Sequence, residues 1–149
     1  AVFIGSGDED PNFESALRRK ASEHHLLGNV HFVPYTNDIL SLFLDIDVLV
    51  HFTRVGEGFG RVIVEAMAAE CGLLVSNNGA LPELVDHGQN GFVAQDVEEL
   101  SSYIKLMASE PECLTQLKAT ARQMAKQYQA ALIARRLETI YDRVLDGVA

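Results

Sequence analysis

Short apolar runs alternate along the chain with longer segments in which apolar residues recur at helical spacing. The runs predict buried strands over residues 1–5, 29–34, 46–52, 72–76 and 90–95. Helices are predicted over residues 11–27, 38–45, 60–71 and 80–86, from Asp96 to about Ser109, and from Pro111 to near Gly147. Strands that are apolar throughout and alternate with helices are typical of a parallel sheet covered on both faces. The pattern therefore predicts an α/β protein with a Rossmann-like parallel sheet and helices on both faces.

The loops that follow the strands of such a sheet are the places where its ligands bind. Three turns have this position: GSG at residues 5–7, the turn after VHFVP, and GEGFG at residues 56–60. The GSG turn lacks a third glycine and is followed by three acidic residues, which would repel phosphate. A dinucleotide-binding fingerprint is therefore not expected there.

Composition and charge exclude several classes of function. The chain has 149 residues, the size of one ordinary domain, and 48% of them are hydrophobic. A formal net charge of −9 argues against general nucleic-acid binding, which needs clustered cations, so any bound phosphate must be held locally. The apolar runs are far shorter than a membrane span of about 20 residues. No signal peptide is evident, and the two separate cysteines fit a reducing cytoplasm.

The remaining titratable side chains have plain interpretations. The five histidines show no metal-ligand spacing, so they are expected to be solvated or core residues, and no metal site is predicted. Lys118, Arg122 and Lys126 recur every four residues and form a basic stripe. A solvated helix face is the favoured interpretation of this stripe; the alternative is contact with an anionic membrane through a partner domain.

GEGFG carries the first candidate carboxylate, Glu57. The turn precedes a predicted helix, so the amides of Gly58, Phe59 and Gly60 should lie at the helix N-terminus, where a diphosphate would fit. A purely structural interpretation is also open for Glu57, because a carboxylate beside the first turn gains about 0.3–1 kcal/mol from the helix dipole.

The second candidate, Glu65, stands in the middle of the apolar segment VIVEAMAA. Burying an unpaired carboxylate costs several kcal/mol, so Glu65 must meet a donor, a cation or a crevice open to solvent. The hydroxyls of a ribose would supply donors. The structural alternative is an ion pair with Arg61, one helical turn earlier.

The segments EGFGRVIVEAMA and SNNGALPELVDHGQNGFVA together resemble the donor-binding signature of retaining glycosyltransferases with the two-domain GT-B fold. That large group includes sucrose, mannosyl and lipopolysaccharide glycosyltransferases. Its signature is a glutamate, seven residues and a second glutamate, which Glu57 and Glu65 match. The order of predicted elements agrees over nearly the whole chain, so the fold implied is the C-terminal half of GT-B.

The resemblance implies a role for each matching residue. Glu57 would be the catalytic residue that contacts the donor sugar near the reacting centre, and Gly58, Phe59 and Gly60 would bind sugar and phosphate. Glu65 would bind the ribose. The backbone of Val33, Pro34 and Tyr35 would face the base. The donor implied is a nucleotide-sugar such as a UDP- or GDP-sugar, used with retention and without a metal ion or other cofactor.

Some family features have no counterpart in the sequence. A basic pair that neutralises the diphosphate, and an N-terminal domain that binds the acceptor, would both precede Ala1. The chain alone is therefore expected not to turn over substrate, and any peripheral membrane contact would come through the absent domain. Glu70, Gly72 and Ala80 stand where the family often has glycine, proline and glycine.

Two other functions remain open from the sequence. A nucleotide-sugar 2-epimerase shares the overall fold and also binds ribose through an acidic residue, although the spacing of the two glutamates with GFG favours the transferase. The second alternative is a degenerate nucleotide-binding module that serves as an interaction domain, with Glu70 and Ala80 as signs of decay.

Overall fold

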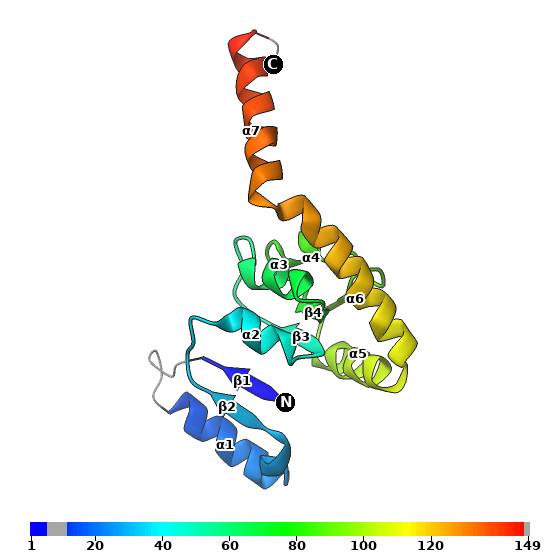
Figure 1. Cartoon of the computed structure of the whole chain (residues 1–149). Helices are drawn as coiled ribbons and strands as arrows, with labels where there is room; N and C mark the ends of the chain where they lie inside the picture. Colours follow the sequence, from blue (N-terminus) through cyan, green and yellow to red (C-terminus); the bar gives the residue numbers. More distant parts are fainter. Residues whose placement is uncertain (6–11, 148–149) are drawn as a thin grey trace. The chain divides into compact units, whose positions relative to one another are not determined.

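The computed structural model describes residues 1–5 and 12–147, which fall into two compact units, residues 1–39 and residues 40–149 (Figure 1). Of the GSG turn at residues 5–7, Gly5 is described, and the two residues that follow it lie outside the described ranges. None of the helices in the described ranges is long and apolar enough to cross a membrane.

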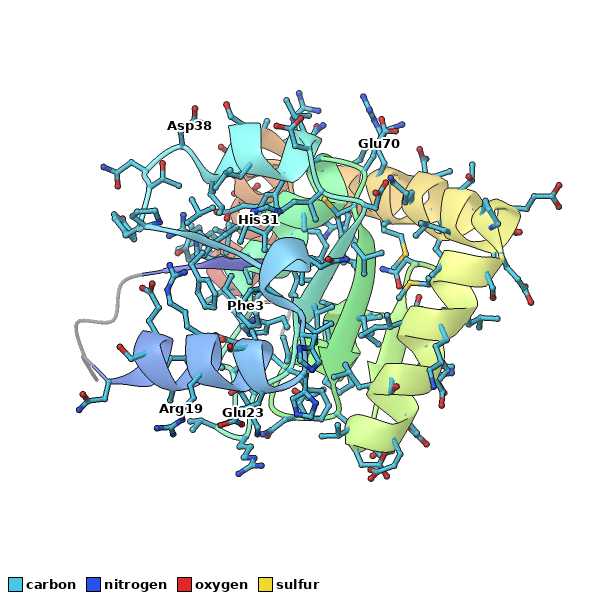
Figure 2. The ribbon with its side chains drawn as sticks, turned by 90° about the horizontal axis from the view of Figure 1, so that it is seen from below. Phe3, Arg19, Glu23, His31, Asp38 and Glu70 are labelled. Carbon is cyan, nitrogen blue, oxygen red and sulfur yellow. The ribbon has the colours of Figure 1, made fainter. Side chains whose placement is uncertain are left out.

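The first unit is a pair of parallel strands with one helix against it. Strands β1 (Val2–Ile4) and β2 (His31–Val33) pair in parallel, and α1 (Phe13–Glu23) and the short η1 (Leu27–Asn29) connect them. The rings of Phe3 and Phe32 stack at 5.4 Å, and the Arg18 guanidinium of α1 lies 4.2 Å from the Phe32 ring centroid. Figure 2 shows Phe3 on its strand and the Arg19 and Glu23 side chains on α1, an exposed pair 3.9 Å apart.

The first strand is exposed, contrary to the sequence prediction that it is buried. Val2, Phe3 and Ile4 keep 44%, 45% and 36% of their surface accessible. Within the first unit, β1 pairs in parallel with β2. Strands that are apolar throughout are typical of sheets with both faces covered. In the first unit, α1 and the short η1 are the helices that accompany the strand pair.

The second unit contains a three-stranded parallel sheet in the order β3–β4–β5. Its strands are β3 (Val48–His51), β4 (Gly72–Ser76) and β5 (Phe92–Ala94). Its helices are α2 (Ile39–Leu44, which begins at the boundary of the units), α3 (Arg61–Ala68), α4 (Leu81–Leu84), α5 (Val97–Ser109), α6 (Pro111–Ala125), η2 (Lys126–Tyr128) and α7 (Ala130–Leu145). Every residue of β4 is buried, and Leu74 packs with Phe92, Met107 and Leu117 in the core. The predicted parallel α/β architecture with helices on both faces is confirmed.

The helix boundaries follow local chemistry except near the C-terminus. Asp96 caps α5 as predicted, with Oδ1 accepting a hydrogen bond from the Glu99 N–H at 2.8 Å. The helix predicted from Pro111 to Gly147 is instead divided, because Gln129 has extended backbone angles of −61° and 133°. Neither proline nor glycine marks this break. No side chain of α7 is buried, and its apolar stripe of Ile133, Leu137, Ile140 and Val144 is exposed.

Two cations of the basic stripe pair with acidic side chains. Lys118 Nζ lies 3.2 Å from Asp47 Oδ1, and Arg122 forms an ion pair with Glu70. The third, Lys126, donates to Gln123 Oε1 at 2.6 Å. These contacts support the solvated helix face, because the stripe's cations already have partners on the protein's own surface.

Glu70 ends α3 in a left-handed conformation that usually favours glycine. Its φ is 60°, and the Cys71 N–H donates to the Ala66 carbonyl at 3.0 Å, which closes the last helical turn. A side chain in this region costs about 1–2 kcal/mol. The ion pair with Arg122, on α6, joins two half-exposed side chains and offsets only part of that cost (Figure 2 labels Glu70).

Replacing Glu70 by glycine should therefore stabilise the protein relative to replacing it by alanine. Both substitutions remove the ion pair with Arg122, but only Glu70→Gly relieves the left-handed strain. We expect the free energy of unfolding of the glycine variant to be higher by about 1 kcal/mol. Urea unfolding of the two variants measures the difference, and equal midpoints would contradict the strained conformation at this position.

Candidate functional site

The candidate site lies where two neighbouring parallel strands end. The loop after β3 leads to α3, and the turn after β4 leads to α4; the two meet at Glu57 and residues 78–80. The Ala80 N–H donates to the Glu57 carbonyl at 2.9 Å. Gly79 has a φ of +58°, and a Cβ there would collide with the backbone N and O of Glu57. The backbone of Glu57 is therefore fixed by a contact that only glycine permits.

Further hydrogen bonds connect the two loops. The Thr53 N–H donates to Ser76 Oγ at 3.1 Å, and Asn78 Nδ2 donates to the Thr53 carbonyl at 3.4 Å. Ala80 has φ −80° and ψ −3°. A second glycine is common at this position in the family that the sequence resembles. Alanine adopts these angles without strain, so the substitution leaves the backbone of this turn unperturbed.

Unpaired amides gather at the start of α3. Gly60 caps the helix with a φ of 82° and no side chain hydrogen-bonds to the helix start. Within residues 1–5 and 12–147, no protein acceptor is found for the N–H groups of five consecutive residues: Gly58, Phe59, Gly60, Arg61 and Val62. Together with the positive end of the helix dipole, these donors provide what an anion site requires, and anion binding here stays a prediction.

The Glu57 carboxylate stands beside these amides and touches a histidine. Its side chain is 37% exposed, and Oε2 lies 3.5 Å from Nε2 of His51, the last residue of β3. That nitrogen is buried and has no hydrogen-bond partner in the described structure. An unsatisfied buried polar group costs about 1–3 kcal/mol. The sequence prediction treated His51 as a solvated or core residue; its only signal was its position at the strand end before GEGFG.

Glu65 lies half-exposed on α3 and is not enclosed by its apolar neighbours. Ile63, Ala66 and Met67 are buried, whereas 34% of the Glu65 side chain is accessible. Its Oε1 is 3.7 Å from the Arg61 guanidinium, so the structural alternative from the sequence is present. The Arg61 side chain is 85% exposed, and such a pair contributes about 0.2–1 kcal/mol at most. The carboxylate therefore remains available to a ligand.

The residues predicted to face a base belong to the first unit. Val33 ends β2, and its carbonyl accepts a hydrogen bond from the Gly5 N–H at 3.1 Å. Pro34 and Tyr35 are exposed, and the Tyr35 hydroxyl donates to Asn37 Oδ1 at 2.8 Å. The base contact of these residues stays a prediction, because they lie in a different unit from Glu57.

Phe59, within the glycine-rich turn, contacts the segment that separates α6 from α7. Its ring meets the ring of Tyr128 edge-on, with centroids 6.1 Å apart and planes at 70°. Burial raises the pKa of the Tyr128 hydroxyl, the Asp86 charge raises it further, and Arg136 lowers it. The hydroxyl is therefore neutral at physiological pH, and Tyr128 acts here as an aromatic support for the turn.

An open polar pocket of about 460 Å³ extends along the same carboxyl edge of the sheet. Loops from all three strands line it: Phe52, Thr53, Arg54, Ser76, Asn77, Asn78, Gln95, Asp96, Val97 and Glu98. Across residues 1–5 and 12–147, no group of three or more His, Cys, Asp and Glu side chains could hold a metal ion. This edge thus offers carboxylates, a row of amide donors and hydrogen-bonding side chains.

Comparison with known proteins places these features in a family. The model of the family described as glycosyl transferases group 1 matches residues 1–124. The N,N'-diacetylbacillosaminyl-diphospho-undecaprenol alpha-1,3-N-acetylgalactosaminyltransferase of Campylobacter jejuni is 30% identical over 99% of this chain and 38% of its own length. Spore coat protein SA of Bacillus subtilis is 29% identical over 95% of this chain and 40% of its own length.

Solved structures show the same similarity. The crystal structure of Anabaena HepE in complex with UDP superposes with a TM-score of 0.84 at 27% identity, over 95% of this chain and 40% of that one. A structure of HepE in complex with UDP-glucose superposes equally well, at 26% identity. The chain therefore spans about two fifths of the length of these relatives.

Gly79 was not identified as a site residue from the sequence, and its substitution tests the contact with Glu57. Gly79→Ala combines a collision with backbone atoms and a left-handed φ, so we expect the free energy of unfolding to fall by more than about 1 kcal/mol. Gly58→Ala is the matched control, because a Cβ at Gly58 meets nothing within 4 Å. Urea unfolding of both variants measures the effect; equal stability would show that the two loops separate easily.

Proposed function

The chain belongs to the glycosyl transferases group 1 family, and we propose that it is the donor-binding part of an enzyme that transfers a sugar from a nucleotide-sugar to an acceptor. One observation carries the proposal. The Glu57 carboxylate and five consecutive unpaired amides, from Gly58 to Val62, stand together at the carboxyl edge of a parallel sheet. A negatively charged diphosphate fits the amides, and a sugar attached to it would then reach the carboxylate.

The proposed reaction breaks the bond between the anomeric carbon and the diphosphate oxygen. The bonding electrons leave with the diphosphate, whose growing charge the amides and dipole of α3 stabilise. The acceptor oxygen bonds to the anomeric carbon, and its proton passes to the departing diphosphate oxygen. Glu57 contacts the donor sugar and, being negative, stabilises positive charge at the anomeric centre. Retention of configuration and independence of metal ions belong to the proposal through the family resemblance.

Glu65 is proposed to bind the ribose hydroxyls, and Val33, Pro34 and Tyr35 to face the base. The half-exposed carboxylate of Glu65 and its weak pairing with Arg61 support this role, since little is lost when a ligand replaces the arginine. Uracil is the proposed base of the donor, because the structures of HepE that resemble this chain contain UDP and UDP-glucose.

The acceptor site and the cations for the diphosphate are proposed to lie outside these 149 residues. The relatives are about two and a half times as long as the matched region, and the net charge of the chain is −9. An acidic surface does not retain a diphosphate by long-range attraction, so the proposal assigns that role to oriented amides and to cations of a further domain. A cytoplasmic location is part of the same proposal.

The family match favours the transferase over a nucleotide-sugar 2-epimerase. The degenerate-module alternative loses its structural support at Ala80, which has ordinary backbone angles, and at Glu70, which is accommodated at a helix end away from the amide cluster. The two remaining functions predict different effects of substituting Glu57: the transferase would lose sugar transfer, whereas the biological role of an inactive module would be unchanged.

Glu57→Gln should abolish sugar transfer by the complete protein while leaving UDP binding intact. The substitution keeps the shape of the side chain and removes the charge beside the anomeric carbon, so kcat should fall by about 100-fold or more. Transfer is measured by UDP release from UDP-sugars in the presence of acceptor extracts, and UDP affinity by calorimetry. Glu112→Gln, an exposed acid in the first turn of α6, is the control and should retain full activity.

A Glu57→Gln variant with unchanged transfer would contradict the proposed role of Glu57. A complete protein that binds none of UDP, GDP or ADP, and releases none of them from their sugar conjugates, would contradict the transferase itself. That second result would favour the inactive module.

Glu65 should account for recognition of the ribose. Removing its charge with Glu65→Gln should weaken UDP binding by about 10- to 100-fold, the effect of losing hydrogen bonds to a charged group. The wild type should lose a similar factor when 2′-deoxy- or 3′-deoxy-UDP replaces UDP, whereas the variant should hardly distinguish the three nucleotides. Calorimetric titration measures these affinities; additive losses from variant and deoxynucleotide would show that Glu65 does not contact the ribose.

A further inference from the structure

His51 has a buried nitrogen that faces the Glu57 carboxylate. The residue ends β3, so its position is set by the parallel pairing of β3 with β4, where it lies opposite Val75. Nε2 is 3.5 Å from Glu57 Oε2, is shielded from solvent and has no hydrogen-bond partner among the described residues. The Glu57 carboxylate is therefore the acceptor that this nitrogen faces.

The carboxylate selects one form of the imidazole. A lone pair on Nε2 would face the negative oxygen and be repelled, whereas an Nε2–H would donate to it. A small approach of the two side chains converts the 3.5 Å contact into a charge-assisted hydrogen bond of ordinary length. The contact with Oε2 therefore favours a proton on Nε2.

We propose that His51 is a positioning residue that holds the Glu57 carboxylate at the donor sugar. This inference rests on the proposed function of Glu57. The backbone of Glu57 is already fixed by Gly79 and Ala80, but its side chain has three rotatable bonds and is 37% exposed. No other side-chain partner of this carboxylate is found within the described ranges. Without His51 the carboxylate would sample several rotamers, and a displacement of about 1 Å from productive geometry costs about 100-fold in rate.

A merely structural histidine would behave differently on substitution. If the imidazole only fills space at the end of β3, a residue of similar bulk should replace it without effect on catalysis. If it only stabilises the fold, its loss should lower thermal stability and nucleotide affinity together. A positioning role predicts instead that kcat falls selectively, because the amides that bind the diphosphate and the carboxylate of Glu65 are untouched.

The test compares two substitutions in the complete protein, His51→Leu and His51→Gln. Leucine keeps the bulk without a donor, and glutamine places an amide N–H near the position of Nε2. We expect kcat with UDP-glucose, or with whichever UDP-, GDP- or ADP-sugar the wild type uses, to fall about 10- to 100-fold in His51→Leu. KM for that donor and the calorimetric Kd for UDP should stay within about 3-fold. His51→Gln should recover most of the activity, and His24→Leu, at the end of α1, should match the wild type.

Several results would overturn the proposal. Unchanged kcat in His51→Leu would remove the positioning role, and equal kcat in the leucine and glutamine variants would show that no donor is needed. A joint fall of kcat, UDP affinity and melting temperature would assign His51 to the fold alone.

A second readout does not depend on sugar transfer. Long-range ¹H–¹⁵N NMR of the imidazole should show the proton on Nε2 in the wild type, with a shift that changes in Glu57→Gln. An Nε2 without a proton would contradict the contact. If the wild type transfers no sugar, the proposed function fails, and this spectrum still decides whether His51 holds Glu57.

Discussion

The close approach of the turn at Gly79 to the backbone of Glu57 is the constraint on which the rest of the site depends. Two adjacent parallel strands end at the same edge, so the loops that follow them must either separate or pack. They pack because Gly79 has no side chain and adopts a left-handed φ, which allows Ala80 to donate to the Glu57 carbonyl. Glu57 is thereby tied to the buried strand β4.

A second close contact, at Gly60, joins the site to the core. Gly60 follows Glu57 by three residues and is buried with a positive φ, and a Cβ there would lie 3.1 Å from the Leu81 side chain and 3.3 Å from that of Ile63. The start of α3 is therefore packed against the start of α4. The amides at this helix end are presented by a rigid support, which lowers the reorganisation needed when an anion binds.

The partners of both site glutamates contribute little to the stability of the fold. His51 lies 3.5 Å from Glu57 without an aligned hydrogen bond, and Arg61 lies 3.7 Å from Glu65 with most of its own side chain in solvent. A carboxylate placed on an apolar helix or beside a buried imidazole adds little to stability. Local arrangements that stability does not explain are typical of functional sites. Because the chain has a net charge of −9, its overall field repels anions, and anion binding must depend on local donors such as these amides.

The sequence by itself determined the parallel α/β fold and the candidate carboxylates. Apolar strands, helix caps such as Asp96 and the glycine-rich turn before α3 depend on neighbours within a few residues, and these local signals are readable from the chain. The division of the last helix at Gln129 was not readable, since no proline or glycine marks it. The exposure of β1 within its two-stranded unit was not readable either, because a short apolar run does not say how many elements cover a strand.

Only the tertiary structure decided the roles of Gly79 and His51. Gly79 is 22 residues from Glu57, and His51 belongs to a different element from the turn that carries the carboxylate. The contact of Gly79 exists because β3 and β4 lie side by side in one register, and the loop held there brings Glu57 back to His51 at the end of β3. The sequence pattern identified which residues can do chemistry, and the pairing of strands decided which of them meet.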